Sequence, residues 1–186
     1  MRRTRATTSW VIGLCAATAA AVLAQGPPQR SPAPLNPFGV EALAPLLASW
    51  IASERDAATA QGVEPIPPAI RAVLEGYVPD AVLDRVRWRE GASELSMPQN
   101  VIRFGHASAV TLDDVIVFQE GSPALEDPRF WAHELKHVMQ FEEWGVEGFA
   151  TRYLNDYQAV ENEAQEFRWQ FMKQAGLIPE VAPANQ

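Results

Sequence analysis

Apolar residues recur at helical spacing shortly after the start of the chain. Successive members of the set lie one, three or four positions apart, as expected for one face of a helix. This face consists of Val40, Leu43, Leu47, Trp50 and Ile51. We therefore predict a helix from about residue 38 to residue 58, within an accessory segment over residues 38–62. Pro45 lies inside this helix and is expected to shorten or kink it.

The middle of the chain combines signals for short helices and for strands. Residues 66–88 place prolines where two helices would begin, which predicts two short helices. Residues 101–104 and 110–119 are rich in β-branched and aromatic side chains. This composition predicts a small antiparallel sheet or hairpin that turns near Asp113-Asp114.

The last third of the chain is predicted to be helical. Asp127-Pro128 has the residue types of an N-cap followed by the first helical position, and the helix is expected to continue to about Trp144. A second long helix is expected over about residues 157–175, ended by Gly176 and then Pro179.

The first 24 residues resemble a secretory signal peptide. Arginines precede an uncharged, Ala-rich run over residues 10–23, and a small-residue cleavage pattern ends at Ala24. The run is shorter than the roughly 20 residues of a membrane-spanning helix. We expect a secreted or periplasmic product with no stable membrane insertion after cleavage. The alternative is an uncleaved N-terminal anchor.

One domain is predicted for the remaining chain. Residues 25–37 contain five prolines and are expected to form an extended linker. Residues 65–178 are expected to form an α+β domain, mostly helical, with a short antiparallel β-hairpin or sheet packed on the first C-terminal helix. Residues 179–186 are expected to be a tail.

Charge and cysteine content exclude several classes of function. The 186 residues include 15 Lys and Arg against 23 Asp and Glu, for a net charge of −8. This sign is unfavourable for binding nucleic acid or anionic lipid. The only cysteine, Cys15, lies in the predicted signal peptide, so the mature protein is expected to contain no disulfide.

The first C-terminal helix carries an H-E-x-x-H motif, His133-Glu134-Leu135-Lys136-His137. Histidines four positions apart share a helix face, where both imidazoles can bind one zinc ion. Glu134 is rotated away from the direction of the ligands and is placed to accept a proton from a zinc-activated water. The sequence therefore predicts a Zn²⁺ site. The alternative is a helix with two unrelated histidines. Lys136 is the observation that supports this alternative, because zincin helices normally have an uncharged residue between the leucine and the second histidine.

A third ligand is expected from the last helix. Glu161 borders the apolar stripe of this helix, whereas Glu163 lies further off on the other side. Glu161 is the preferred ligand and Glu163 the alternative. His106 is a weaker candidate, and a solvated acidic face is the structural alternative.

The segment His133–Gln140 reads HELKHVMQ and resembles the HELxHVxQ segment of the eCIS core domain family, named for extracellular contractile injection systems. The resemblance extends over about residues 65–175 and implies a zincin-like domain. It implies a gluzincin-type site in which His133 and His137 bind zinc and Glu134 is the base. The signal peptide argues against this chain being cargo of an injection machine.

Gluzincins take their third ligand from a downstream segment that Glu161-Asn162-Glu163-Ala164 matches. Gln165 stands where many of them have an Asp that supports the site, so the supporting hydrogen bond is expected to be altered or supplied by another group. Asp113-Asp114 replaces the Gly-Asn that often forms the family's hairpin turn.

Three hypotheses about function follow. The leading one is an exported zinc metallopeptidase that acts on a peptide or protein substrate, which would add as a strand beside the edge Val115–Gln119. Tyr153 or Tyr157 would donate a hydrogen bond to the oxyanion that forms when the peptide carbonyl is attacked. The alternative is that both tyrosines have only a packing role. The second hypothesis is a zinc-containing but non-hydrolytic binding or scaffold module. The third is a helix that binds no metal.

Overall fold

The computed structural model describes residues 37–92 and 108–178, with only the backbone described at Pro37 and Phe38. All of these residues lie within one unit, residues 34–186. The signal peptide, most of the linker, the tail, the strand expected at residues 101–104 and His106 lie outside the described residues, so their assignments stay predictions.

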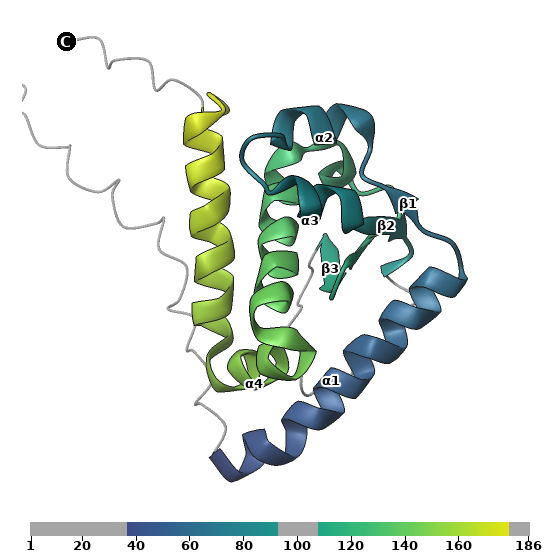
Figure 1. Ribbon diagram of the computed structural model, residues 1–186, viewed down its shortest axis with the longest axis vertical. Coiled ribbons are helices and arrows are strands. Elements are labelled where there is room, and N and C mark those ends of the chain that lie inside the picture. The colour runs from purple at the N-terminus through teal and green to yellow at the C-terminus, as the bar shows by residue number, and fades with distance from the viewer. Residues whose placement is uncertain (1–36, 93–107, 179–186) are drawn as a thin grey trace, which may run out of the picture. The chain divides into compact units, whose positions relative to one another are not determined.

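The accessory helix is present as α1, Pro37–Ala60 (Figure 1). The helix continues past Pro45, so this proline does not shorten it. On the apolar face of α1, Val40, Leu47 and Ile51 are buried, and Leu43 and Trp50 are partly buried against the same cluster. Arg55, on the last part of this helix, donates from Nε to Asp114 Oδ1 at 2.8 Å and from Nη2 to Asp114 Oδ2 at 3.1 Å. These two hydrogen bonds attach α1 to the turn of the hairpin at Asp113-Asp114.

Two short helices follow, as the prolines predicted. Helix α2 spans Pro68–Leu74 and helix α3 spans Asp80–Arg85, with Pro67 and Pro79 as their N-cap residues. They lie between two short strands, β1 (Glu64–Pro65) and β2 (Arg87–Glu90).

The sheet has the order β1-β2-β4-β3, where β3 is Ala109–Leu112 and β4 is Val115–Phe118. Strands β3 and β4 form the predicted antiparallel hairpin, which turns at Asp113-Asp114. The prediction of a purely antiparallel sheet was wrong, because β2 pairs with β4 in parallel. The prediction that Val115–Gln119 is an edge was also wrong, since β4 lies between β2 and β3.

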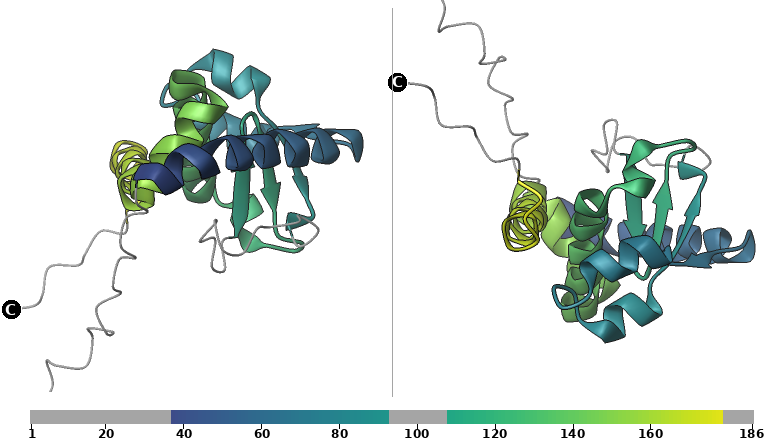
Figure 2. Two further views of the ribbon diagram at one scale, coloured as in Figure 1. Left: turned by 90° about the horizontal axis from the view of Figure 1, so that it is seen from below. Right: turned by 90° about the horizontal axis from the view of Figure 1, so that it is seen from above.

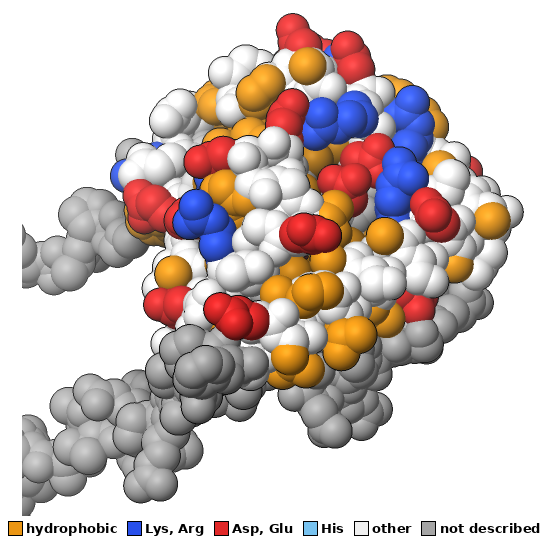
Figure 3. Space-filling model, turned by 60° about the horizontal axis from the view of Figure 1, so that its bottom comes forward, with side chains coloured by type: hydrophobic (Ala, Val, Ile, Leu, Met, Phe, Trp, Pro, Cys, Tyr) orange, Lys and Arg blue, Asp and Glu red, His pale blue; other side chains and the backbone are white. Residues whose placement is uncertain are grey.

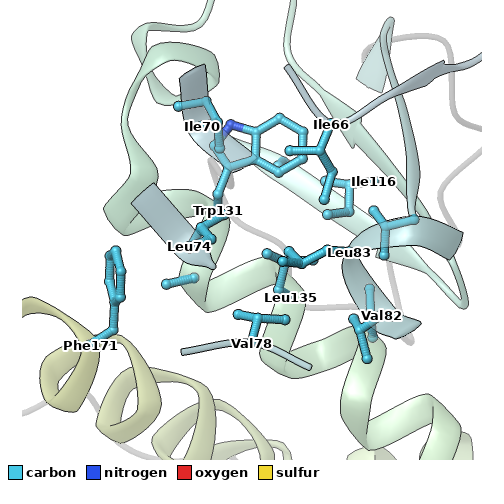
Figure 4. Packing of buried hydrophobic residues seen from close by; sticks show 14 of the residues in the cluster. Ile66, Ile70, Leu74, Val78, Val82, Leu83, Ile116, Trp131, Leu135 and Phe171 are labelled. Atoms are coloured by element: carbon cyan, nitrogen blue, oxygen red, sulfur yellow. The ribbon is translucent and has the colours of Figure 1, made fainter. Parts of the chain in front are cut away.

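The hairpin is buried on both faces. On one face, Val110, Leu112, Val115 and Val117 pack in a cluster with apolar residues of α1. Figure 2 (left) shows α1 crossing the strands. On the other face, Ile116 and Phe118 pack with α2, α3 and the histidine-bearing helix. Trp131 and Leu135 of that helix are fully buried in this second cluster (Figure 4).

Helix α4, Pro128–Gln174, contains two residues with non-helical backbone angles, Gly145 and Asp156. These breaks divide it into residues 128–144, 146–155 and 157–174. The first and third segments are the two helices predicted from the sequence, and the short middle segment was not predicted. Figure 1 shows the third segment, in yellow, returning beside the first, in green.

The fold is therefore α+β, mostly helical, with a small mixed sheet. None of the described helices combines the length and apolarity needed to cross a bilayer. On the face drawn in Figure 3, basic side chains stand among acidic ones.

Candidate metal centre

The first segment of α4 places the two motif histidines on one face. Asp127 caps this segment by accepting a hydrogen bond from the Arg129 backbone at 2.9 Å, and Pro128 follows it, as predicted. His133 and His137 then stand one turn apart, with ring centroids 4.8 Å apart and Nε2 atoms 3.2 Å apart. Burial of Trp131 and Leu135 on the same segment fixes the rotation of the helix about its axis.

The return segment brings Glu161 to the same point. Gly145 adopts φ 70° and ψ 167°, a combination that is essentially restricted to glycine, and Asp156 provides the second break. Glu161 Oε2 lies 3.4 Å from His133 Nε2, and its Oε1 lies 3.6 Å from His137 Nε2. The structure thus brings together the three residues that the sequence selected as ligands.

These three residues form a group that could hold a metal ion. Ligand atoms about 2.0–2.1 Å from a tetrahedral zinc ion lie about 3.3–3.4 Å from one another. The Nε2 atoms of the two histidines, 3.2 Å apart, are close to that spacing. The two contacts of Glu161 come from different carboxylate oxygens, and with one ligand atom from each residue the three atoms lie within 4.8 Å of one another. Two imidazoles and one carboxylate are also a donor set typical of zinc. The residues present therefore fit the metal that the motif implies.

The charges at the site favour a cation. Burial opposes ionisation of Glu161, but hydrogen bonds and attraction from His133 and His137 outweigh it and lower the pKa of Glu161 to about 2. Burial also opposes protonation of His137, but Glu161 and Glu134 outweigh it and raise the pKa of His137. The centre is thus arranged to hold positive charge, for which a proton and a metal ion compete.

Glu134 is placed differently from the three candidate ligands. Its side chain is buried, and Oε2 accepts a hydrogen bond from Thr111 Oγ1 at 2.7 Å. Thr111 belongs to β3, so this bond connects the motif helix to the sheet. Sequence reasoning missed Thr111. The available signal was a single hydroxyl in the otherwise apolar run Ala109–Leu112.

The three candidate ligands and Glu134 all line one small pocket of about 60 Å³. Its lining residues come from β3 and from the three segments of α4. They are Ala109, Thr111, His133, Glu134, His137, Phe149, Tyr153 and Glu161. Tyr153 lines the pocket and is also buried in the cluster that includes α1, whereas Tyr157 only packs against that cluster.

The alternative ligand Glu163 points elsewhere. Its Oε2 accepts a hydrogen bond from Gln140 Nε2 at 3.1 Å and lies 3.6 Å from Lys136 Nζ. Lys136, the charged residue that departs from the usual motif, thus has an acidic partner. The side chain of Gln165 is exposed and makes no hydrogen bond within the described residues, so any supporting bond to the site must come from another group, as expected.

Gln140 takes the supporting position instead. Its Oε1 lies 2.8 Å from His137 Nδ1, on the side of the ring opposite the candidate metal position. Its place in the motif, three residues after His137, was visible in the sequence. Its contacts with Val160 and Glu163 were not, because these residues lie 20 and 23 positions away.

Comparison with known families supports part of the expected resemblance. Residues 65–145 match the model of the eCIS core domain, which is somewhat less than half of the chain. The match includes His133, Glu134, His137 and Gln140, and it leaves out α1 and Glu161. The comparisons with curated proteins and with solved structures each found no match.

Proposed function

We propose that this protein is a zincin-like, zinc-dependent peptidase. The observation that carries the proposal is a single pocket that contains three converging ligand side chains and a separate buried carboxylate, Glu134. A purely structural metal site uses four protein ligands, whereas a catalytic one uses three and leaves a position open. When bound, zinc would polarise a substrate carbonyl and lower the pKa of a water.

Glu134 acts as the general base. It accepts a proton from the attacking water and passes it to the leaving amine. The hydrogen bond from Thr111 holds one carboxylate oxygen, so the other remains for this task. Tyr153 lines the same pocket, which supports a role in donating a hydrogen bond to the oxygen that gains charge on attack.

The substrate adds to the sheet at β3, one of the two edge strands among the described strands. Gln119 N donates to Ser108 O at 2.9 Å, which marks Ser108 and Gln119 as a hydrogen-bonded pair. Because such pairs alternate along an antiparallel ladder, the backbone groups of Ala109 and Thr111 point away from β4. These are the two β3 residues that line the pocket, so an added peptide strand would run past the candidate metal.

One observation favours a second candidate function. A pocket of about 60 Å³ accommodates an ion and a few waters but no large side chain. This size suits a zinc-containing module that binds or supports partners without hydrolysis. Catalysis separates the two functions because only the peptidase requires Glu134.

The deciding experiment is cleavage of a peptide library by the zinc-loaded protein and by Glu134→Gln. We expect the variant to retain zinc and to lose at least about 100-fold in rate, the usual contribution of a general base. Glu143→Gln, at an exposed position of the same helical segment, is the control and should cleave normally. Zinc-loaded wild type that cleaves no peptide would leave the non-hydrolytic module as the function.

Export also belongs to this proposal. It rests on the signal-peptide pattern of residues 1–24, which lie outside the described residues. N-terminal sequencing of the protein recovered outside the cytoplasm should begin at Gln25.

A further inference from the structure

Gln140 makes three hydrogen-bonding contacts although its side chain is fully buried. Oε1 faces His137 Nδ1 at 2.8 Å. Nε2 faces the backbone oxygen of Val160 at 3.1 Å and Glu163 Oε2 at 3.1 Å. One side chain thus connects a candidate ligand on the first α4 segment to the stretch of the third segment that carries Glu161.

The orientation of the Gln140 amide follows from its neighbours. A backbone carbonyl and a carboxylate can only accept hydrogen bonds, so the amide nitrogen must face Val160 and Glu163. The amide oxygen must then face His137. An oxygen that only accepts requires a proton on the ring nitrogen opposite it, so His137 carries its proton on Nδ1.

This proton position determines what His137 can do. A neutral imidazole has one N–H, so a proton on Nδ1 leaves the lone pair of Nε2 directed at His133 and Glu161. Metal-binding histidines commonly donate their other N–H to such a partner. His133 differs, because its buried Nδ1 has no hydrogen-bond partner among the described residues. Among the described residues, only the His137 ring is therefore oriented by a hydrogen bond at its Nδ1.

We propose that Gln140 is a positioning residue that fixes the Nδ1–H tautomer of His137 and holds the backbone beside Glu161, with Glu163 and Lys136 keeping its amide in place. The inference rests on the metal site of the proposed function. It also assigns separate roles to the two glutamates. Glu163 is occupied by Gln140 and Lys136, whereas Glu161 faces the imidazole nitrogens.

The first test is the tautomer of His137 in the chelator-treated protein. Long-range proton–nitrogen NMR, at a pH that keeps the ring neutral, distinguishes Nδ1–H from Nε2–H. We expect Nδ1–H in the wild type and a shift toward Nε2–H in Gln140→Met, which keeps the size of the side chain. A wild-type protein with the proton on Nε2 would overturn the proposal. This result needs no metal, so it tests Gln140 even if the protein binds no zinc.

The second test is zinc affinity, measured against a competing chelator. Loss of an outer partner typically costs about 10- to 100-fold, and we expect a loss in that range for Gln140→Met. Gln170→Met, on the exposed side of the third segment, is the matched control and should bind zinc as the wild type does. Unchanged affinity in Gln140→Met would contradict the proposal.

A rescue variant separates positioning from general damage. In the double variant Gln140→Glu, Glu163→Gln, residue 140 still accepts from His137 and residue 163 now donates to residue 140, but Val160 O loses its donor and faces a carboxylate oxygen. We therefore expect the folded double variant to restore the Nδ1–H tautomer and to recover the zinc affinity only in part. A folded double variant whose neutral His137 keeps its proton on Nε2 would overturn the assignment of the tautomer to the hydrogen bond at residue 140.

Discussion

Thr111 on the edge strand donates a 2.7 Å hydrogen bond to the carboxylate of Glu134 on the motif helix. The two residues are 23 positions apart in sequence and both are buried. The sheet thereby sets the position of the proposed base independently of the three candidate metal ligands. The strand proposed to receive substrate is thus the strand that holds the base.

Thr111→Val should reduce peptide cleavage while leaving zinc content unchanged. Valine keeps the shape of threonine and removes the donor, and hydrogen bonds to charged groups contribute about 1.5–3 kcal/mol. Since about 1.4 kcal/mol corresponds to tenfold in rate, we expect a loss of about 10- to 100-fold in kcat. Thr111→Ser keeps the hydroxyl and should retain most of the activity. Equal rates for the two variants would show that the hydrogen bond has no catalytic role.

Asp113→Asn should stabilise the protein at neutral pH. Asp113 adopts φ 58°, a left-handed conformation that asparagine tolerates well. Burial, and then the neighbouring Asp114, raise the pKa of Asp113. The ionised carboxyl therefore costs folding free energy above its folded-state pKa, and this cost disappears as the pH falls below the unfolded value of about 3.9.

Thermal unfolding at pH 7 and at acidic pH checks this prediction. The advantage of Asp113→Asn should be greatest at pH 7 and should shrink on acidification. Asp114→Asn is the control with the opposite sign, because Asp114 accepts two hydrogen bonds from Arg55. We expect that control to lose about 1 kcal/mol. A destabilised Asp113→Asn at pH 7 would refute the account of this turn.

Gly145→Ala should lower both stability and zinc affinity. Its backbone angles are essentially restricted to glycine, and strain of this kind costs about 1–3 kcal/mol. The bend at Gly145 directs the chain that returns Glu161 to the histidines, so relaxing it should displace that ligand. Gly121→Ala also replaces a glycine of positive φ, but in a loop outside the pocket. Chelator competition should show weaker zinc binding in the first variant only.

Local sequence signals predicted most of the helical structure. Pro67 and Pro79 indicated where α2 and α3 begin, and the Asp127-Pro128 pair indicated the start of the histidine-bearing segment. The motif spacing and the apolar stripe of the last helix selected three residues that the structure brings within 3.6 Å. Helix starts, the spacing of the motif and the position of an apolar stripe all depend on residues close together in the sequence, so they can be recognised without knowing the rest of the fold.

The sheet order and the supporting contacts depend on distant partners. Strand β2 reads Arg-Trp-Arg-Glu and is only half-buried, so its sequence gives little sign of a parallel pairing with β4. The interior position of β4 depends on that pairing. Gln140 likewise has contacts 20 and 23 positions away, and no local pattern identifies them.

The measurement that tests the central claim most directly is zinc binding by the purified protein and by ligand variants, with chelator competition and metal analysis on the same samples. The account predicts one zinc per chain in the wild type, none retained in His137→Ala, and severe loss of affinity in Glu161→Ala. Glu166→Ala, an exposed glutamate on the same segment, should bind as the wild type does. A wild-type protein without zinc affinity, or a Glu161→Ala variant that binds zinc as tightly as the wild type, would contradict it.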